Sequence, residues 1–146
     1  MQKVQIFTDG ACRGNPGPGG YGGLIIRNGK THEIKGATKN TTNNIMEMTA
    51  VIEALKELKE PCEVELTTDS QYVIKGITEW MDGWIRKNWV NSQKKPVKNK
   101  ELWVEILRLS KIHPITWKWV RGHTGHPENE RADALANEAI DEMYRF

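Results

Sequence analysis

Four acidic residues stand in short polar signatures spread along this chain, and together they could do metal chemistry. They are Asp9 in Thr-Asp-Gly, Glu47 in Asn-Asn-Ile-Met-Glu, Asp69 in Thr-Asp-Ser and Asp133 in Arg-Ala-Asp. Carboxylates gathered from strand ends and helix starts form a site for hard cations such as Mg²⁺. We expect a shared site of this kind to support metal-assisted phosphate chemistry.

Each acid also has a simpler interpretation. Asp9 and Asp69 each close an expected strand, where aspartate commonly starts a turn or caps the next element. With Asn44 as N-cap, Glu47 would occupy N3 of a capping box. Glu47 and Asp133, however, share a helix face with apolar residues further along, and a carboxylate facing the interior is costly unless paired or metal-bound. The inward direction favours a common metal site.

Four acids that converge repel one another, and this raises some pKa values above the ordinary value of about 4. Divalent cations would relieve the repulsion. Two cations about 4 Å apart could bind a phosphate, activate water and stabilise the leaving oxygen. The expected reaction is therefore phosphodiester hydrolysis or transfer.

Alternating strands and helices would position these acids. Strands are expected at 4–9, 19–27, 30–38, 63–68 and 115–120, and helices from 45 to Pro61, at 71–78, at 99–111 and from 127 onward. Asn28-Gly29 predicts a hairpin, so the first three strands form a meander. The later alternation predicts an α/β protein with a mixed sheet and helices on both faces.

Composition fits one globular domain over residues 1–146, and the charge is distributed unevenly along the chain. The chain has 38% hydrophobic and 27% charged residues and a formal charge of +2. Residues 86–100 hold six basic and no acidic side chains, whereas the rest holds 15 basic and 19 acidic ones. Cys12 and Cys62 lack disulfide-framework or zinc spacing, and no stretch is long enough to span a bilayer. We expect a soluble, monomeric, cytoplasmic protein without an obligatory protein partner.

Many motifs in order give the chain a resemblance to type 1 ribonuclease H over essentially its whole length. The motifs are Thr8-Asp9-Gly10, Gly14-Asn15-Pro16-Gly17-Pro18-Gly19-Gly20, Thr41-Thr42-Asn43-Asn44 with Met46-Glu47, Thr68-Asp69-Ser70-Gln71-Tyr72-Val73, Lys94-Lys95-Pro96-Val97, and Gly122-His123 leading into Gly125-His126-Pro127-Glu128-Asn129-Glu130 and Asp133. The resemblance implies a ribonuclease H-like sheet of three antiparallel and then two parallel strands. It also implies endonucleolytic cleavage of the RNA strand of an RNA·DNA hybrid, leaving 5′-phosphate and 3′-hydroxyl ends.

The resemblance also implies individual roles. Asp9, Glu47, Asp69 and Asp133 would hold two Mg²⁺ ions, with Mn²⁺ as a possible substitute, and Asp69 would help orient the attacking water. His123 would transfer a proton or assist product release, as suits an imidazole titrating near neutrality. On the residues alone, His123 reads as a surface histidine.

The basic segment carries tryptophans and resembles the substrate-binding protrusion of some family members, here at about 80–98. Phosphate-binding and stacking candidates are Trp80, Trp84, Arg86, Lys87, Lys94, Lys95 and Lys98. Trp84 and Trp89 could instead form the core of a protruding helix pair, and the remaining indoles, Trp103, Trp117 and Trp119, are expected to pack internally. Asp82 and Ile85 make the segment less basic than its fullest version, which predicts weaker or more salt-sensitive binding.

Small polar residues are the candidates for contacts with the hybrid. By resemblance, Thr42 and Asn99 would bind DNA phosphates. Asn40 replaces a common arginine, for which Lys39 could substitute. Asn15, Asn43, Asn44 and Gln71 could recognise the 2′-hydroxyl, although turn and helix-cap chemistry would also explain them. A metal-dependent DNA nuclease or strand-transfer enzyme, and a non-catalytic hybrid-binding module, remain alternatives.

Overall fold

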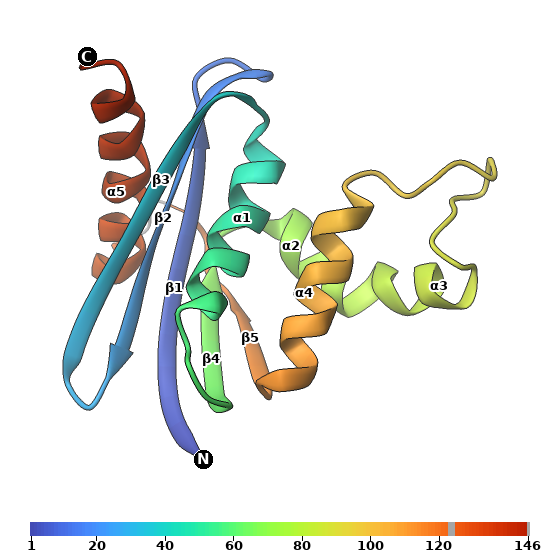
Figure 1. The fold of residues 1–146 in the computed structure, drawn as a ribbon, viewed down its shortest axis with the longest axis horizontal. Coiled ribbons are helices and arrows are strands. Elements are labelled where there is room, and N and C mark those ends of the chain that lie inside the picture. Colours follow the sequence, from blue (N-terminus) through green and yellow to red (C-terminus); the bar gives the residue numbers. More distant parts are fainter. Residues whose placement is uncertain (123–124, 146) are drawn as a thin grey trace.

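The computed structural model describes residues 1–122 and 125–145, and within them a mixed sheet of five strands forms the centre of the molecule (Figure 1). The strands are β1 (Gln2–Cys12), β2 (Gly17–Arg27), β3 (Lys30–Thr41), β4 (Cys62–Thr68) and β5 (Ile115–Trp119). Their order is β3-β2-β1-β4-β5. β1, β2 and β3 pair antiparallel, whereas β4 pairs parallel with β1 and with β5. The predicted arrangement of three antiparallel and then two parallel strands is confirmed.

The helices follow the expected order. They are α1 (Asn43–Lys56), α2 (Gln71–Lys75), the π-helical turn η1 (Gly76–Trp80), α3 (Met81–Arg86), α4 (Lys100–Ile112) and α5 (Pro127–Met143). Figure 1 shows α1 on one face of the sheet and α5 on the other, with α4 beside α1. The prediction of helices on both faces is therefore confirmed.

Glycines in β2 allow α5 to lie directly on the sheet. An added Cβ at Gly20 would overlap the carbonyl oxygen of Ala136, and one at Gly22 would overlap that of Ala132. Both positions point toward α5, because alternate residues of a strand face the same side. The close approach brings Asp133, which stands between these contacts on α5, near the central strand β1.

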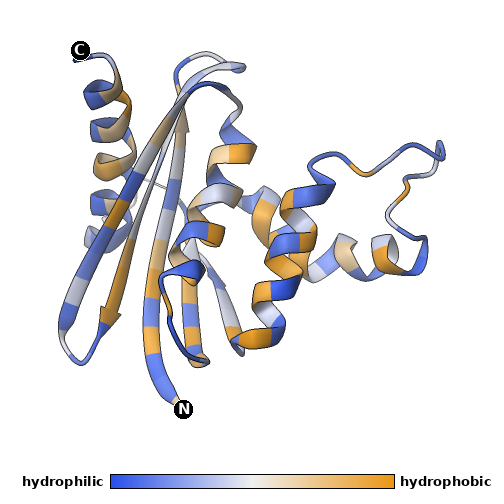
Figure 2. Cartoon of the chain, viewed as in Figure 1, coloured by the Kyte–Doolittle hydropathy of each residue, from blue (hydrophilic) through white to orange (hydrophobic). Residues whose placement is uncertain are grey.

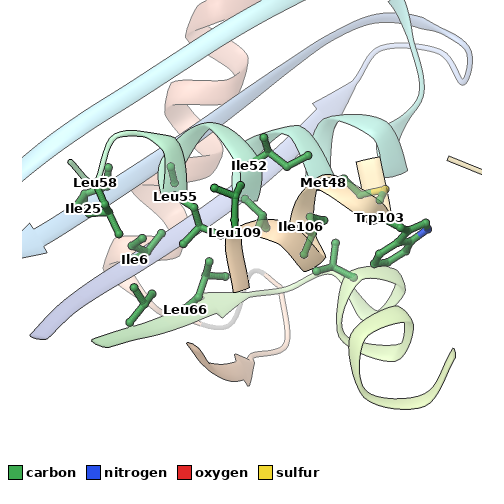
Figure 3. Close-up of a cluster of buried hydrophobic side chains, with 14 of the residues drawn as sticks. Ile6, Ile25, Met48, Ile52, Leu55, Leu58, Leu66, Trp103, Ile106 and Leu109 are labelled. Atoms are coloured by element: carbon green, nitrogen blue, oxygen red, sulfur yellow. The ribbon is translucent and has the colours of Figure 1, made fainter. Parts of the chain in front are cut away.

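The main hydrophobic core fills the opposite face, between the sheet and helices α1 and α4 (Figure 3). Ile6 and Leu66 from the sheet meet Leu55 of α1 and Ile106 of α4, and all four side chains are almost fully buried. Burying a side chain of this size contributes roughly 1.5 to 3 kcal/mol. Figure 2 shows the corresponding alternation of hydrophobic and hydrophilic residues on α4, and a largely hydrophilic segment after α3. This core gives β1, β4 and α1 a rigid support.

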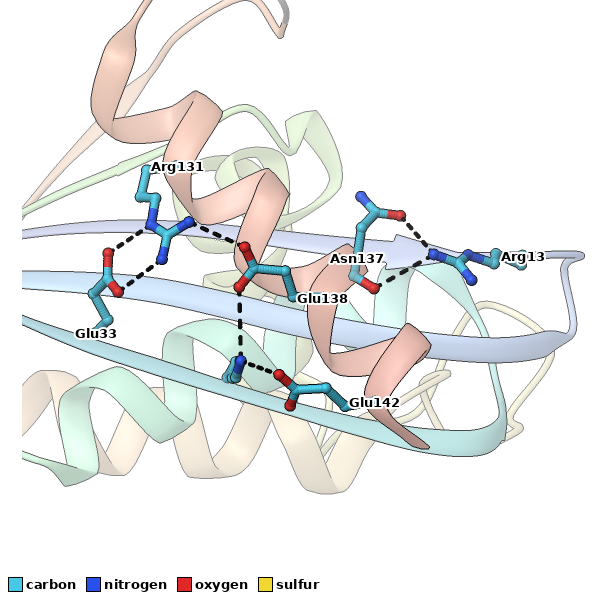
Figure 4. A network of polar contacts seen from close by, with 7 residues as sticks. Arg13, Glu33, Arg131, Asn137, Glu138 and Glu142 are labelled. Atoms are coloured by element: carbon cyan, nitrogen blue, oxygen red, sulfur yellow. Dashed lines mark hydrogen bonds and ion pairs between the residues drawn. The ribbon is translucent and has the colours of Figure 1, made fainter. Parts of the chain in front are cut away.

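A polar network holds α5 against the edge strand β3 (Figure 4). Arg131 donates two hydrogen bonds to Glu33 at 2.7 and 3.0 Å and one to Glu138 at 3.1 Å. Lys35 of β3 lies 2.6 Å from Glu142 and 3.6 Å from Glu138. Exposed ion pairs contribute little singly, but a bidentate arginine within a network fixes geometry. The network therefore fixes how the helix that carries Asp133 lies on the sheet.

The helix expected at 71–78 is longer and interrupted. Ser70 caps it as expected, with its hydroxyl accepting from the backbone N–H of Val73 at 3.1 Å. The helical path then continues through η1 and α3 to Arg86. The Trp103 ring lies so close to Gly76 that any Cβ there would overlap it. Helical periodicity alone did not reveal this continuation.

Both cysteines are free thiols, Cys62 buried and Cys12 half-buried. Among the described residues, no helix combines the length and apolar character needed to cross a membrane.

Candidate metal and nucleic-acid site

Asp9 lies within the central strand, at the point where its parallel neighbour ends. The pairing of β1 with β4 stops at Thr8 and Thr68, whereas the pairing of β1 with β2 continues to Cys12. The expectation that Asp9 closes its strand is therefore wrong, because the glycine-rich β2 extends the hairpin beyond it. Asp69 does directly follow the last residue of β4. The expected side-by-side placement of Asp9 and Asp69 is correct.

Glu47 reaches the same place from α1. The N-cap of α1 is Thr42, whose Oγ1 accepts from the N–H of Ile45 at 3.2 Å, so the expected capping box with Asn44 as N-cap is wrong. Glu47 instead lies in the second turn, is 5% exposed and accepts a hydrogen bond from the backbone N–H of Gly10. A Cβ at Gly10 would overlap the backbone of Glu47, so only glycine lets α1 approach β1 this closely. The inward direction predicted for Glu47 is observed.

Asp9, Glu47 and Asp69 each offer a carboxylate oxygen, and these oxygens lie within 4.8 Å of one another. Burial, followed by the charge of Asp69, raises the pKa of Asp9 from 3.8 to about 8. Burial also raises the pKa of Glu47 well above 4.5, followed by the charges of Asp9 and Asp69. A divalent cation between these oxygens would offset both burial and repulsion. The donor set therefore fits a hard metal ion.

Asp133 joins the site from α5 but stands slightly apart. It lines a cavity of about 340 Å³ together with Asp9, Glu47 and Asp69, and its hydrogen bond to Asp9 also raises the pKa of Asp9. Its backbone carbonyl accepts from Asn137 Nδ2 at 3.1 Å. In the described part of the chain, the tight acidic group comprises the other three acids. Asp133 is thus placed to complete a metal site from its side.

The predicted small polar residues surround the same cavity. Asn43, Asn44 and Gln71 line it beside the acids. Asn15, at the β1–β2 turn, accepts a hydrogen bond from the backbone N–H of Asn43 at 3.1 Å. Thr42 serves as the cap of α1. The local turn and cap chemistry is present for Asn15 and Thr42, and contacts with a nucleic acid remain a prediction for all five residues.

Residues 123 and 124 lie outside the described part of the chain, and so does the predicted role of His123. Around this segment the structure shows residues that the sequence did not single out: Arg121, His126, Asn129 and Glu130 lie with Asp9, Asp69 and Asp133 around a small cavity. The Nδ2 atom of Asn129 is buried and has no hydrogen-bond partner among the described residues. Three of them, His126, Asn129 and Glu130, belong to the Gly125–Glu130 motif. Their spacing alone did not distinguish a role in the site from a role in starting α5.

The tryptophans divide between core and surface. Trp80 is 37% exposed, and its ring meets Tyr72 edge to face at a centroid distance of 5.9 Å. Trp84 and Trp89 are half-buried against the core, which supports the packing interpretation for both. Trp103 is fully buried as expected, but Trp119 is 42% exposed, so the expectation that it packs internally is wrong. β5 is an edge strand of the sheet, and Trp119 is its last residue.

The basic segment extends away from the sheet. Figure 1 shows α3 and the loop after it extending past α4. Its basic side chains are all exposed, and none of them forms an ion pair with another described residue: Arg86, Lys87, Lys94, Lys95 and Lys98. Asn99 joins the end of this segment to α2, because its Nδ2 donates to the hydroxyl of Tyr72 at 3.1 Å. The segment therefore presents free positive charge and is connected to the acidic site through α2.

Comparison with known proteins agrees with this geometry. The RNase H family model matches residues 1–141. The ribonuclease H of Geotalea uraniireducens is 66% identical over 139 residues, 95% of each chain, and that of Hydrogenovibrio crunogenus is 59% identical over 143 residues, 98% of this chain and 99% of the relative.

Solved structures show the same fold. LC9-RNase H1 has a TM-score of 0.86 at 33% identity, covering 97% of this chain and 74% of that one. LC11-RNase H1, solved in complex with an RNA/DNA hybrid, has a TM-score of 0.75 at 31% identity, covering 96% and 98%. The chain belongs to the ribonuclease H family, whose members are endonucleases that cleave the RNA strand of RNA·DNA hybrids.

Proposed function

We propose that this chain hydrolyses the RNA strand of RNA·DNA hybrids with two Mg²⁺ ions, leaving 5′-phosphate and 3′-hydroxyl ends. The observation that carries the proposal is the buried group of Asp9, Glu47 and Asp69, with carboxylate oxygens within 4.8 Å of one another. Its raised pKa values mark a site that favours a bound cation over free negative charge.

Asp9, Glu47, Asp69 and Asp133 would hold the metal ions. The ions, when bound, supply Lewis-acid stabilisation of the phosphate and a more acidic water. By the resemblance to ribonuclease H, Asp69 would also help orient the attacking water. His123 would move a proton near the leaving group or assist product release. Mn²⁺ is the expected substitute, because it also prefers oxygen ligands.

The substrate would be held on both sides of the acids. Asn43, Asn44 and Gln71 line the cavity and offer donors and acceptors suited to a 2′-hydroxyl. The exposed lysines and arginine of the basic segment would bind backbone phosphates. The complex of LC11-RNase H1 with an RNA/DNA hybrid supports this assignment of substrate. We further propose that the protein works as a monomer in the cytoplasm.

Digestion of matched duplexes tests the proposal. Purified protein is incubated with end-labelled RNA·DNA, RNA·RNA and DNA·DNA duplexes of one sequence, with Mg²⁺ or with EDTA. We expect cleavage only of the RNA in the hybrid, only with Mg²⁺, and fragments that a 5′-phosphate-dependent exonuclease degrades. Cleavage of the DNA duplex with an intact hybrid would instead indicate a DNA nuclease, and binding without cleavage would indicate a non-catalytic module.

A further inference from the structure

Asp69 occupies a short link whose backbone is held on several sides. β4 ends at Thr68 and α2 begins at Gln71. The N–H of Ser70 donates to Thr68 Oγ1 at 3.1 Å, and the N–H of Val120 donates to the carbonyl of Thr68 at 3.0 Å. The Ser70 N–H belongs to the planar peptide group that also carries the Asp69 carbonyl, so these bonds hold the N–H end of that group and leave its carbonyl end to another contact.

That contact comes from the exposed tryptophan at the end of β5. Trp119 pairs with Thr68 across the two parallel strands, and its indole Nε1 donates to the backbone carbonyl of Asp69 at 3.1 Å. The ring is 42% exposed, whereas that of Trp103 is fully buried. Packing in the core therefore explains a tryptophan at position 119 less well than the hydrogen bond of its indole N–H does.

We propose that Trp119 is a positioning residue, whose indole N–H fixes the Asp69 peptide and thereby directs the Asp69 carboxylate toward Asp9 and Glu47. The carboxylate is attached through Cβ to the same Cα as the bonded carbonyl, so a shift of this backbone segment would displace the carboxylate oxygens. An added Cβ at Gly122 would lie 2.8 Å from Asp69 Oδ2, so the chain leaving β5 also approaches the carboxylate itself. Trp119 at the end of β5 therefore holds the backbone carbonyl of Asp69, and Gly122 after it lies close to the Asp69 carboxylate.

The inference rests on the proposed metal site, because Asp69 is useful there as a ligand. Groups that orient metal ligands from outside typically change metal affinity or activity by about 10-fold to 100-fold when removed. For a single neutral hydrogen bond we expect the lower end, about 10-fold. The effect should fall on Mg²⁺ binding and turnover, and not on affinity for the hybrid, since Trp119 bonds the Asp69 backbone and is not one of the exposed basic side chains that we propose bind phosphates.

The test compares Trp119→Phe, which keeps an aromatic ring but lacks the N–H, with Trp117→Phe as the matched control two residues earlier in β5. Mg²⁺ affinity is measured from the rise of the thermal midpoint with Mg²⁺ concentration, and kcat and KM are measured on the hybrid. We expect Trp119→Phe to bind Mg²⁺ about 10-fold more weakly, with an unchanged KM for the hybrid and a kcat that excess Mg²⁺ restores. Trp117→Phe should keep the wild-type Mg²⁺ dependence.

Equal Mg²⁺ dependence in Trp119→Phe and wild type would overturn the inference and leave the proposed function intact. A wild-type thermal midpoint that does not change with Mg²⁺ concentration would overturn both the role of Trp119 and the proposed function. Nuclear magnetic resonance of the wild-type protein gives a readout that needs no variant: the indole N–H of Trp119 should exchange slowly despite its exposed ring, and should shift more than that of Trp117 when Mg²⁺ is added. A fast-exchanging, unshifted resonance would also contradict the role.

Discussion

Replacing Asp9 by asparagine should stabilise the protein when no metal is bound. The pKa of Asp9 is raised to about 8 in the folded state and is 3.8 ordinarily, so between these values the folded protein holds a proton that the unfolded chain has lost. The unfolded state then binds fewer protons, and the free energy of unfolding falls as pH rises through this window. Asparagine carries no charge to bury, so the variant should not lose this stability as the pH rises.

The size of the effect follows from the shift. From 3.8 to pH 7 is about three pH units, each worth about 1.4 kcal/mol, which sets an upper limit of about 4 kcal/mol. The asparagine amide must still be desolvated, so we expect a gain of about 2 to 4 kcal/mol at pH 7. For a chain of this length, that gain would raise the thermal midpoint by about 5 to 10 °C.

The difference in the free energy of unfolding between Asp9→Asn and wild type would be measured by thermal and urea unfolding in EDTA, followed by circular dichroism, from about pH 4 to pH 8. It should be near zero at the acidic end and grow with pH, and Mg²⁺ should narrow it by stabilising the wild type alone. Asp82→Asn is the charge-matched control, because Asp82 is exposed on α3 and should show no such pH-dependent gain. A variant that is no more stable than wild type at pH 7 without metal would refute burial of this carboxylate as the cause.

Three further predictions concern the protrusion, its helix and a buried histidine. Lys94→Ala with Lys95→Ala should weaken hybrid binding and, in a salt titration, reduce the slope of log K against log salt by up to about 2, with kcat at saturating substrate unchanged; an unaltered slope would place both lysines away from phosphates. Gly76→Ala should cost about 1 to 3 kcal/mol in urea unfolding, because its Cβ would overlap a buried indole ring. Gly83→Ala, with open space around it, should instead stabilise α3 by about 0.5 to 1 kcal/mol, so equal effects would contradict the structure. Burial lowers the pKa of His113 from 6.5, so its protonation favours unfolding and stability should fall as pH drops below about 6.5. Titration of its ring resonances at or above the ordinary pKa would oppose this.

Much of the sheet was predictable because its signals are local. Asn28-Gly29 forms the expected hairpin turn, with positive φ angles of 50° and 74°. The alternation in β4 and β5 and the apolar stripes of α1 and α5 also predicted the right elements. The inward direction of Glu47 followed from its helical spacing alone. These features depend on residues close in sequence, so a single chain carries them.

Features that depend on contacts between distant elements were missed. Asn44 and Thr42 are both good caps, and because β3 extends to Thr41, the N-cap of α1 is Thr42 and the helix begins at Asn43. The continuation of α2 through η1 depends on a ring from α4 that lies against Gly76. Trp119 was expected to pack internally with the other indoles, but it is the last residue of the edge strand β5 and is exposed, whereas Trp117 in the same strand packs against the core. Such outcomes are set by packing partners that are far apart in the sequence.

Metal-dependent cleavage by the acidic group is tested most directly with Asp9→Asn on an end-labelled RNA·DNA hybrid. Binding is measured by fluorescence anisotropy and cleavage by gel electrophoresis, both with Mg²⁺ and beside the wild type. We expect the variant to bind the hybrid about as tightly as the wild type and to lose RNA cleavage by several orders of magnitude, because one ligand of the buried group is gone. Wild-type cleavage by Asp9→Asn would show that these carboxylates are not the catalytic metal site.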